Sequence, residues 1–457
     1  MRTGMLTVDE LVQQVGEGLL DTVVIAFTDM QGRLQGKRCS AEYFVEEVLA
    51  HGAEACDYLL AVDVEMTPVE GYALSSWDTG YGDFVLRPDL STARLVPWWP
   101  GTALVLCDVM RVEASGKPGD IPVAPSPRQV LRAQLDRLAE RGLHAYVGTE
   151  LEFLVFDDSY EAAWQRGYRD LTPANRYNID YSLLGTARIE PLLRRIRAEM
   201  SGAGLYVESA KGECRPGQHE IAFRYAEALV TCDNHSIYKT GAKEIAAQEG
   251  RSISFMAKYD ELEGNSCHIH LSLRDEQGAP VFADDAGEPS SLMRHFLAGQ
   301  LDCLREFTYM LAPNINSYKR FAAGSFAPTA AAWGRDNRTC ALRVVGNGAS
   351  LRMENRVPGG DANPYLAVAA MIAAGLYGIE HNLPLEPEFR GNAYRSQRPR
   401  VPHTLREAAQ LFGDSTIARA AFGEEVVRHY RTAAQVELDA FDSAVTDWEH
   451  VRGFERL

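Results

Sequence analysis

Two pairs of polar side chains lie at alternating positions in extended segments of this sequence. Within residues 146–156, Glu150 and Glu152 share one face of a predicted strand, because successive side chains of a strand alternate. Within residues 267–273, His268 and His270 share a face in the same way. A cation relieves the repulsion between neighbouring carboxylates, so these segments could hold metal ions. Taken alone, each pair fits ordinary satisfied polar side chains at least as well.

Two further segments add acids and arginines. Glu213 and Glu220 bracket a Pro-Gly turn at 216–217 that would bring two strand ends together. In an extended 352–356 segment, two arginines and the glutamate between them would share one face. A surface acid pair and a structural ion-pair ladder are the favoured local interpretations of these segments.

In combination, the four segments indicate phosphoryl transfer. Oxygen donors dominate the acidic set and suit Mg²⁺ or Mn²⁺ better than zinc, and arginines suit phosphate and carboxylate. No phosphate loop, dinucleotide fingerprint or His-Glu-x-x-His motif is present. The candidate metal ligands are Glu150, Glu152, Glu213, Glu220, Glu354 and His268, and the candidate anion-binding residues are Arg320, Arg338, Arg343, Arg352 and Arg356.

The bulk properties narrow the class of protein. A chain of 457 residues favours two or more domains. A net charge of −17 argues against nucleic acid or an anionic membrane as partner. The eight cysteines form no Cys-x-x-Cys pair, and the N-terminus has no apolar signal core. We therefore expect a cytoplasmic protein with reduced thiols.

The elements that must position these residues follow from pattern. Residues 21–111 are β-rich, with a hairpin turn at Gly32, and residues 115–127 are the predicted linker. A helix should start at Pro127, capped by Ser126 with a capping box to Gln129, and end at Gly142. The rest alternates, with helices expected at 191–204, 225–250, 293–311, 366–379 and 404–451 and extended chain at 205–208 and 252–258. The coarse class is α+β.

Taken together, these motifs resemble the glutamine synthetase superfamily over nearly the whole chain. The resemblance implies an N-terminal β-grasp domain (1–120) and a catalytic domain (121–457) built on an antiparallel sheet with flanking helices. It also implies a homo-oligomer, a dodecamer of two stacked hexamers, with active sites between subunits. The matching motifs are Glu150-Leu151-Glu152, Gly217-Gln218-His219-Glu220, His268-Ile269-His270, Asn316-Ser317-Tyr318-Lys319-Arg320, Asn337-Arg338, Arg352-Met353-Glu354-Asn355-Arg356 and Asn363-Pro364-Tyr365-Leu366.

The resemblance also implies a role for each matching residue. Two or more Mg²⁺ or Mn²⁺ ions would be bound, one by Glu152, Glu213 and Glu220, the other by Glu150, His268 and Glu354. Glutamate would be held by Arg320, Arg356 and the Gly264 backbone. ATP, a substrate, would meet Tyr225, His270 and Ser272 at the nucleotide and Arg338, Arg343 and Arg352 at the phosphates. Asp63, Arg338 and Glu213 would be catalytic. The expected reaction joins an amine to the glutamate side chain through a γ-glutamyl phosphate.

Two departures from the family pattern concern the amine. The usual Asp-Gly-Ser-Ser loop reads Asp63-Val64-Glu65-Met66, and Phe326 stands where ammonia-using members carry a glutamate. An aromatic side chain there suits the carbon atoms of a larger amine. The chain is most similar to actinobacterial γ-glutamylethanolamide synthetases, which favours ethanolamine as the amine. A γ-glutamylpolyamine synthetase, with Glu65 or Glu70 holding a distal cation, and a true glutamine synthetase are the alternatives.

Other readings remain at this point. A non-catalytic relative should have lost metal carboxylates, yet all six positions are filled. A metal-dependent hydrolase would not need the arginines. The family's regulatory tyrosine corresponds to Tyr394, but its flanking sequence differs, so we expect a plain surface tyrosine rather than an adenylylation site.

Overall fold

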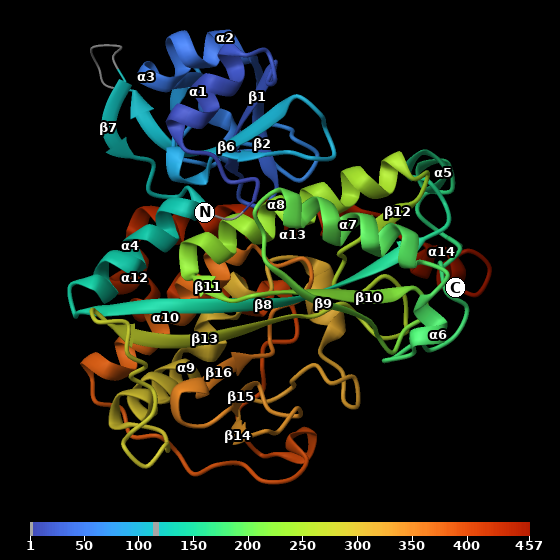
Figure 1. Ribbon diagram of the computed structural model, residues 1–457. Coiled ribbons are helices and arrows are strands. Elements are labelled where there is room, and N and C mark those ends of the chain that lie inside the picture. The colour runs from blue at the N-terminus through green and yellow to red at the C-terminus, as the bar shows by residue number, and fades with distance from the viewer. Residues whose placement is uncertain (1–2, 113–117) are drawn as a thin grey trace.

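Two mixed or antiparallel sheets, one after the other along the chain, organise the molecule (Figure 1). The computed structural model describes residues 3–112 and 118–457. The first sheet has the order β2-β1-β6-β4-β3, with β5 and β7 also pairing with β6. Its strands β1 and β6 run parallel, and the other pairs are antiparallel. The strands are β1 (Thr22–Thr28), β2 (Leu34–Ser40), β3 (Ala53–Cys56), β4 (Asp83–Pro88), β5 (Arg94–Leu95), β6 (Thr102–Val112) and β7 (Pro118–Pro122).

The predicted β-rich segment 21–111 and its hairpin are confirmed, whereas the predicted linker after it is not. The hairpin β1–β2 turns at Gly32, whose φ of +81° is readily adopted by glycine. The predicted linker 115–127 contains β7, because its residues 118–122 pair with β6 instead of running free. Residues 115–117 of that linker lie outside the described residues. α1 (Val8–Gly16) begins at a Thr7–Glu10 capping box.

The second sheet carries the predicted site segments. Its order is β14-β15-β16-β13-β8-β10-β9, and the long strand β8 also pairs with β11 and β12. All described pairs are antiparallel except β14–β15. The strands are β8 (Leu143–Phe156), β9 (Val207–Gly212), β10 (Gln218–Phe223), β11 (Ala226–Glu227), β12 (Ser252–Ser254), β13 (Cys267–Asp275), β14 (Trp333–Arg335), β15 (Leu342–Val345) and β16 (Arg352–Asn355).

Helices cover one face of this sheet and separate it from the first (Figure 1). The side chains of Leu151, Ile221 and Ile269 are fully buried. They point to the face of the sheet that is opposite the polar side chains of the same strands. The predicted helix 366–379 is α10, whose residues are nearly all buried. The main helices are α4 (Pro127–Ala139), α7 (Glu190–Gly202), α8 (Ala228–Gln248), α9 (Ser291–Leu311), α10 (Pro364–Glu380), α11 (Leu405–Asp414), α12 (Thr416–Phe422), α13 (Glu424–Ser443) and α14 (Asp447–Gly453), with the short α5 (Tyr160–Gln165) and α6 (Leu183–Thr186).

Three local expectations are corrected. The Ser126 side chain makes no capping hydrogen bond, so α4 begins with Pro127 but without the predicted capping box. The helix expected from residue 225 begins at Ala228, because residues 226–227 pair with β8. Of the extended segment predicted at 205–208, only residues 207–208 belong to a strand, β9, which continues to Gly212.

A buried arginine joins the two sheets through α4. The Arg128 side chain is 3% exposed, and its guanidinium lies 2.7 Å from Asp89, 2.6 Å from Asp108 and 2.9 Å from Asp233. Asp89 and Asp108 belong to the N-terminal part, and Asp233 belongs to α8. Three carboxylates compensate the desolvated cation, so its loss would leave buried charges unpaired. Within the described ranges, no helix is both long and apolar enough to cross a bilayer.

Candidate active site

Strand register assembles the predicted site on the polar face of the second sheet. Glu152 of β8 lies opposite Glu220 of β10. Glu150, two residues before Glu152, lies opposite His268 of β13. His270 lies opposite Glu354 of β16. Directly opposed residues in antiparallel strands share a face, so the four predicted segments form one continuous row across the sheet.

The first cluster in the row consists of Glu152, Glu213 and Glu220. One carboxylate oxygen from each residue lies within 4.8 Å of the others. Burial raises the pKa of Glu220 to about 8, and the charges of Glu150 and Glu152 add to this effect. A divalent cation would favour the ionised carboxylates, so this cluster fits Mg²⁺ or Mn²⁺.

The second cluster contains both imidazoles. Ligand atoms of Glu150, His270 and Glu354 lie within 4.8 Å of one another. His268 Nδ1 also lies 3.5 Å from a Glu150 oxygen and 3.5 Å from a Glu354 oxygen. Burial opposes ionisation of Glu150, but contacts with His268 and His270 hold its pKa well below the usual range. The structure therefore brings both histidines to this cluster, where the sequence motif assigned only His268 to the metal.

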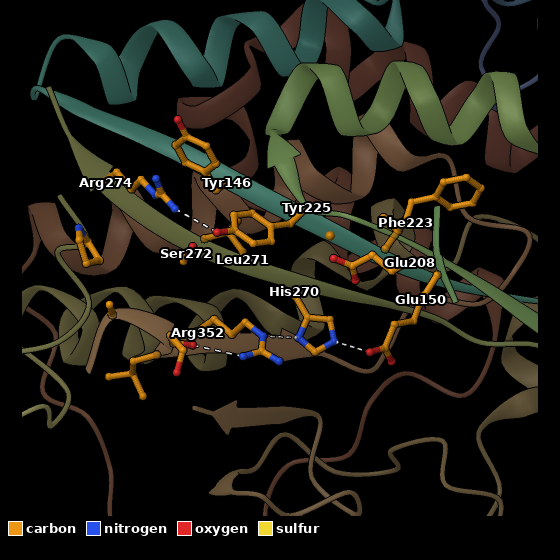
Figure 2. Close-up of a pocket in the computed structure, with 17 residues that line it drawn as sticks. Tyr146, Glu150, Glu208, Phe223, Tyr225, His270, Leu271, Ser272, Arg274 and Arg352 are labelled. Carbon is orange, nitrogen blue, oxygen red and sulfur yellow. Dashed lines mark hydrogen bonds and ion pairs between the residues drawn. The ribbon is translucent and has the colours of Figure 1, made fainter. Parts of the chain in front are cut away.

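The tautomer of His270 follows from its two neighbours. Arg352 donates to His270 Nδ1 at 3.2 Å, so Nδ1 is the acceptor. The proton is then on Nε2, which donates to Glu150 at 3.0 Å. Figure 2 shows Arg352, His270 and Glu150 in one line along the wall of a cavity.

A cavity of about 500 Å³ lies beside the second cluster (Figure 2). The predicted nucleotide residues Tyr225, His270 and Ser272 line it, and so does Arg352. Tyr146 and Arg274, which the motifs did not single out, complete one wall: the guanidinium of Arg274 lies 4.3 Å from the ring centre of Tyr146 and donates to the Tyr225 hydroxyl at 3.1 Å. Their alternation with Ser272 and Gly148 along β13 and β8 was the available signal.

The predicted anion-binding arginines differ in burial and in their partners. Arg343 and Arg356 donate to Glu354 at 2.9 and 2.5 Å. The predicted ion-pair ladder of residues 352–356 is therefore formed only in part, because Arg352 donates to His270 instead of to Glu354. Arg320 is buried and donates to the carbonyl groups of residues 356–358. It packs against Gly264, where an added Cβ would lie 3.1 Å from its side chain. Arg338 is exposed beside a separate hollow that residues 335–338 and 388–391 line.

The two residues predicted to meet the amine, Phe326 and Asp63, lie in different surroundings. Phe326 is 56% exposed, has a φ of +58°, and accepts a 3.4 Å hydrogen bond from Arg356 through its carbonyl. Asp63 accepts hydrogen bonds from the Glu65 and Thr67 N–H groups at 2.9 and 2.8 Å. In the described part of the chain, no hydrogen bond or ion pair joins Asp63 to the clusters.

Tyr394 is not the plain surface tyrosine that the sequence predicted. Its hydroxyl oxygen is buried, next to the backbone of Phe326 and near the guanidinium of Arg356. A hydroxyl in this position is turned toward the site, which local sequence pattern cannot show.

Lys211 is a charged residue of the first cluster that the sequence motifs also did not single out. It lies opposite Glu220 on β9, and its ammonium contacts Glu213 and lies 3.7 Å from Glu220. The ring of Tyr181 covers it at 5.2 Å. Its place two residues before Glu213 was the available signal.

Comparison with known proteins agrees with this geometry. The family description "Glutamine synthetase, catalytic domain" matches residues 124–452. A γ-glutamylethanolamide synthetase of Streptomyces coelicolor is 66% identical over 100% of this chain and 97% of its own length. A glutamate–isopropylamine ligase of a Pseudomonas species is 38% identical over 95% of each chain. A solved structure described as a GmaS–ADP complex is similar with a TM-score of 0.84 and 26% identity, over 97% of this chain and 99% of that one.

Fold and site define a ligase of the kind that uses ATP and divalent metal ions. The family match at residues 124–452 covers well over half of the chain. The chain belongs to the glutamine synthetase family.

Proposed function

We propose that this protein joins glutamate, through its side-chain carboxylate, to a small organic amine, most specifically ethanolamine, with conversion of ATP to ADP and phosphate. The observation that carries the proposal is the row of two carboxylate clusters and arginines beside a nucleotide-sized cavity. The 66% identity to a γ-glutamylethanolamide synthetase over the whole chain supports the choice of amine.

The metal sites follow from the two clusters. Glu152, Glu213 and Glu220 would hold one ion, and Glu150, Glu354 and His268 a second, with His270 turned toward the nucleotide. Bound metal ions would neutralise charge on the transferring phosphoryl group. The residues of the row would then serve to fix carboxylate oxygens in place before substrate arrives.

Binding residues on either side of the row would orient the two anionic substrates. Arg320, Arg356 and the Gly264 backbone would hold glutamate. Tyr225, His270 and Ser272 would hold the nucleoside. The phosphates would be bound by Arg338, Arg343 and Arg352. The glutamate side-chain oxygen would attack the γ-phosphorus, which releases ADP and leaves an acyl phosphate.

The second step requires an uncharged amine. Its nitrogen attacks the acyl carbon, phosphate leaves, and a base takes the surplus proton. The carboxylates of Asp63 and Glu213 are the proposed bases, and Phe326 would pack against the amine's carbon atoms. Asp63 hydrogen-bonds only within its own loop in the described residues, which supports its delivery to the site by a neighbouring copy.

We accordingly propose a homo-oligomer, a dodecamer of two stacked hexamers. We also propose that residues 1–120 form a β-grasp domain and 121–457 the catalytic domain. The hairpin β1–β2, the intervening helical segment and the parallel pair β1–β6 support the first assignment. A cytoplasmic location would keep the eight free thiols reduced.

An amine panel tests the proposal. Purified enzyme with glutamate, ATP and Mg²⁺ should release phosphate with ethanolamine at least tenfold faster, in kcat/KM, than with ammonium or putrescine. A Glu152→Gln variant should be inactive with every amine, whereas the control Glu227→Gln should behave as the parent. Equal rates with ammonium would overturn the amine assignment, and a preference for putrescine would favour the polyamine alternative through exposed Glu65 or Glu70.

A further inference from the structure

The phenol of Tyr394 points inward from an exposed segment of chain. Tyr394 is the middle residue of a short 3₁₀ helix, Ala393–Arg395, whose N-cap Asn392 accepts from the Tyr394 N–H at 3.0 Å. Arg400 donates to the Tyr394 carbonyl at 3.5 Å. These two contacts hold the backbone of Tyr394 in place.

The hydroxyl lacks a full hydrogen bond in this position. Its oxygen is buried and, within the described residues, has no partner with complete hydrogen-bond geometry. The Phe326 backbone N–H approaches this oxygen as a donor, and the positive charges of Arg356 and Arg320 act on it, so the hydroxyl hydrogen is the part left without an acceptor in the described residues. Buried tyrosine hydroxyls normally have a partner, so this oxygen is placed to meet a ligand atom.

The surroundings select the kind of ligand atom. Burial raises the pKa of Tyr394, so the phenol stays protonated and can both donate and accept. The guanidinium groups of Arg356 and Arg320 offer no acceptor to the distal ammonium group of a diamine. A neutral hydroxyl is therefore accommodated better than the distal cation of a diamine.

We propose, resting on the amine-ligase function proposed above, that the Tyr394 hydroxyl hydrogen-bonds the distal hydroxyl of a short amino alcohol substrate. The ring of Phe326 covers the carbon chain of that amine, and Tyr394 recognises its far end. Tyr394 is thereby a specificity-determining residue, and the enzyme selects an amino alcohol over an alkylamine or a diamine.

The test compares two amines of matched size in two enzymes. Ethanolamine and n-propylamine differ by a hydroxyl in place of a methyl group, and Tyr394→Phe removes only the phenolic oxygen. The ratio of kcat/KM for ethanolamine over propylamine should fall about fivefold to tenfold in Tyr394→Phe, the expected loss of one hydrogen bond. The KM for glutamate should stay within twofold. Tyr43→Phe, at an exposed position of the N-terminal part, is the matched control and should keep the parental ratio.

An unchanged ratio, or an equal loss with both amines, would overturn the role of Tyr394 even if ethanolamine remains the preferred amine. A rise in the glutamate KM without a change in the ratio would overturn it as well, because the hydroxyl would then bind glutamate. If the parent enzyme does not use ethanolamine at all, the proposed function itself fails.

Discussion

Phe326 is the residue that we propose distinguishes this chain from ammonia-using members of the family. Its ring is 56% exposed and its backbone adopts the left-handed region, which is rare for an aromatic residue. The strain is compatible with function because the neighbouring Arg356 holds the Phe326 carbonyl. The side chain is thus presented to whatever occupies the adjacent space.

A carboxylate at this position should restore an ammonium site. Phe326→Glu is expected to raise kcat/KM for ammonium relative to ethanolamine by about tenfold, because a charged hydrogen bond contributes roughly 1.5–3 kcal/mol. Phosphate release with each amine measures the change. Phe441→Glu, on the exposed side of α13, should leave the ratio unaltered. A ratio that does not move in Phe326→Glu would show that residue 326 does not face the amine.

Lys211 introduces a positive charge into a cluster otherwise made of three glutamates. Its ammonium competes with a metal ion for Glu213 and Glu220. Lys211→Met should therefore bind Mn²⁺ about tenfold or more tightly, since a unit charge near the site contributes on the order of 1–4 kcal/mol. Mn²⁺ titration followed by electron paramagnetic resonance gives the affinity directly, without turnover. Lys37→Met on β2 serves as the control. Equal Mn²⁺ affinities of the parent, Lys211→Met and Lys37→Met would contradict competition between the Lys211 ammonium and the metal ion.

At the scale of elements, alternation along strands was enough to predict most of the row. Glu150 and Glu152 share a face because strand geometry demands it, and the Pro-Gly turn between β9 and β10 did bring Glu213 and Glu220 into one cluster. The choice between His268 and His270 could not be made from period alone, because both face Glu150. Tyr394 meets the site through a contact between distant segments, which no local pattern encodes.

Close helix packing behind the sheet depends on glycines in α9 and α10. A Cβ at Gly378 would lie 2.0 Å from the His295 carbonyl oxygen, so α9 and α10 would have to separate. Gly378→Ala should destabilise the protein by about 1–3 kcal/mol, as other overpacked cores do. Urea unfolding measures the loss. Gly16→Ala in α1 meets open space and should be neutral or stabilising by up to ~1 kcal/mol; equal effects at both sites would contradict the packing explanation.

At the scale of the whole molecule, the N-terminal and catalytic parts share buried polar groups. Arg128 joins acids of both parts, and His429 on α13 lies 3.0 Å from the Met30 sulfur and 4.6 Å from the Tyr72 ring. The coarse division into two sheets was predictable from the sequence. The contact of α13 with the N-terminal part was not predictable, because His429 carries no local signal of a partner 399 residues away.

His429 should make stability depend on pH. Burial lowers its pKa from 6.5 to about 4, so between these values the unfolded chain binds a proton that the folded chain does not. Stability is therefore full above pH 6.5 and falls as the pH drops toward 4, by roughly 2 kcal/mol at pH 5 from this group. His429→Phe should show a shallower decline of the urea midpoint between pH 7.5 and 5. His450→Phe, in exposed α14, is the control. Parallel pH profiles for His429→Phe and the parent would contradict the assignment.

The single strand β8 pairs with β10, β11, β12 and β13, while β9 and β14 lie at the two ends of the sheet. Glu150 and Glu152 lie on β8 itself, Glu220 lies on β10 beside it, and Glu354 pairs with β13 on its other side. An evolving or engineered chain therefore has little freedom at the centre, where one insertion would shift the register of both clusters together. New amine preferences should arise instead by exchange of the irregular segments around Phe326 and Tyr394, which leave strand pairing untouched. The same division offers a practical route to redesign: diversify those two segments and keep residues 143–156 constant.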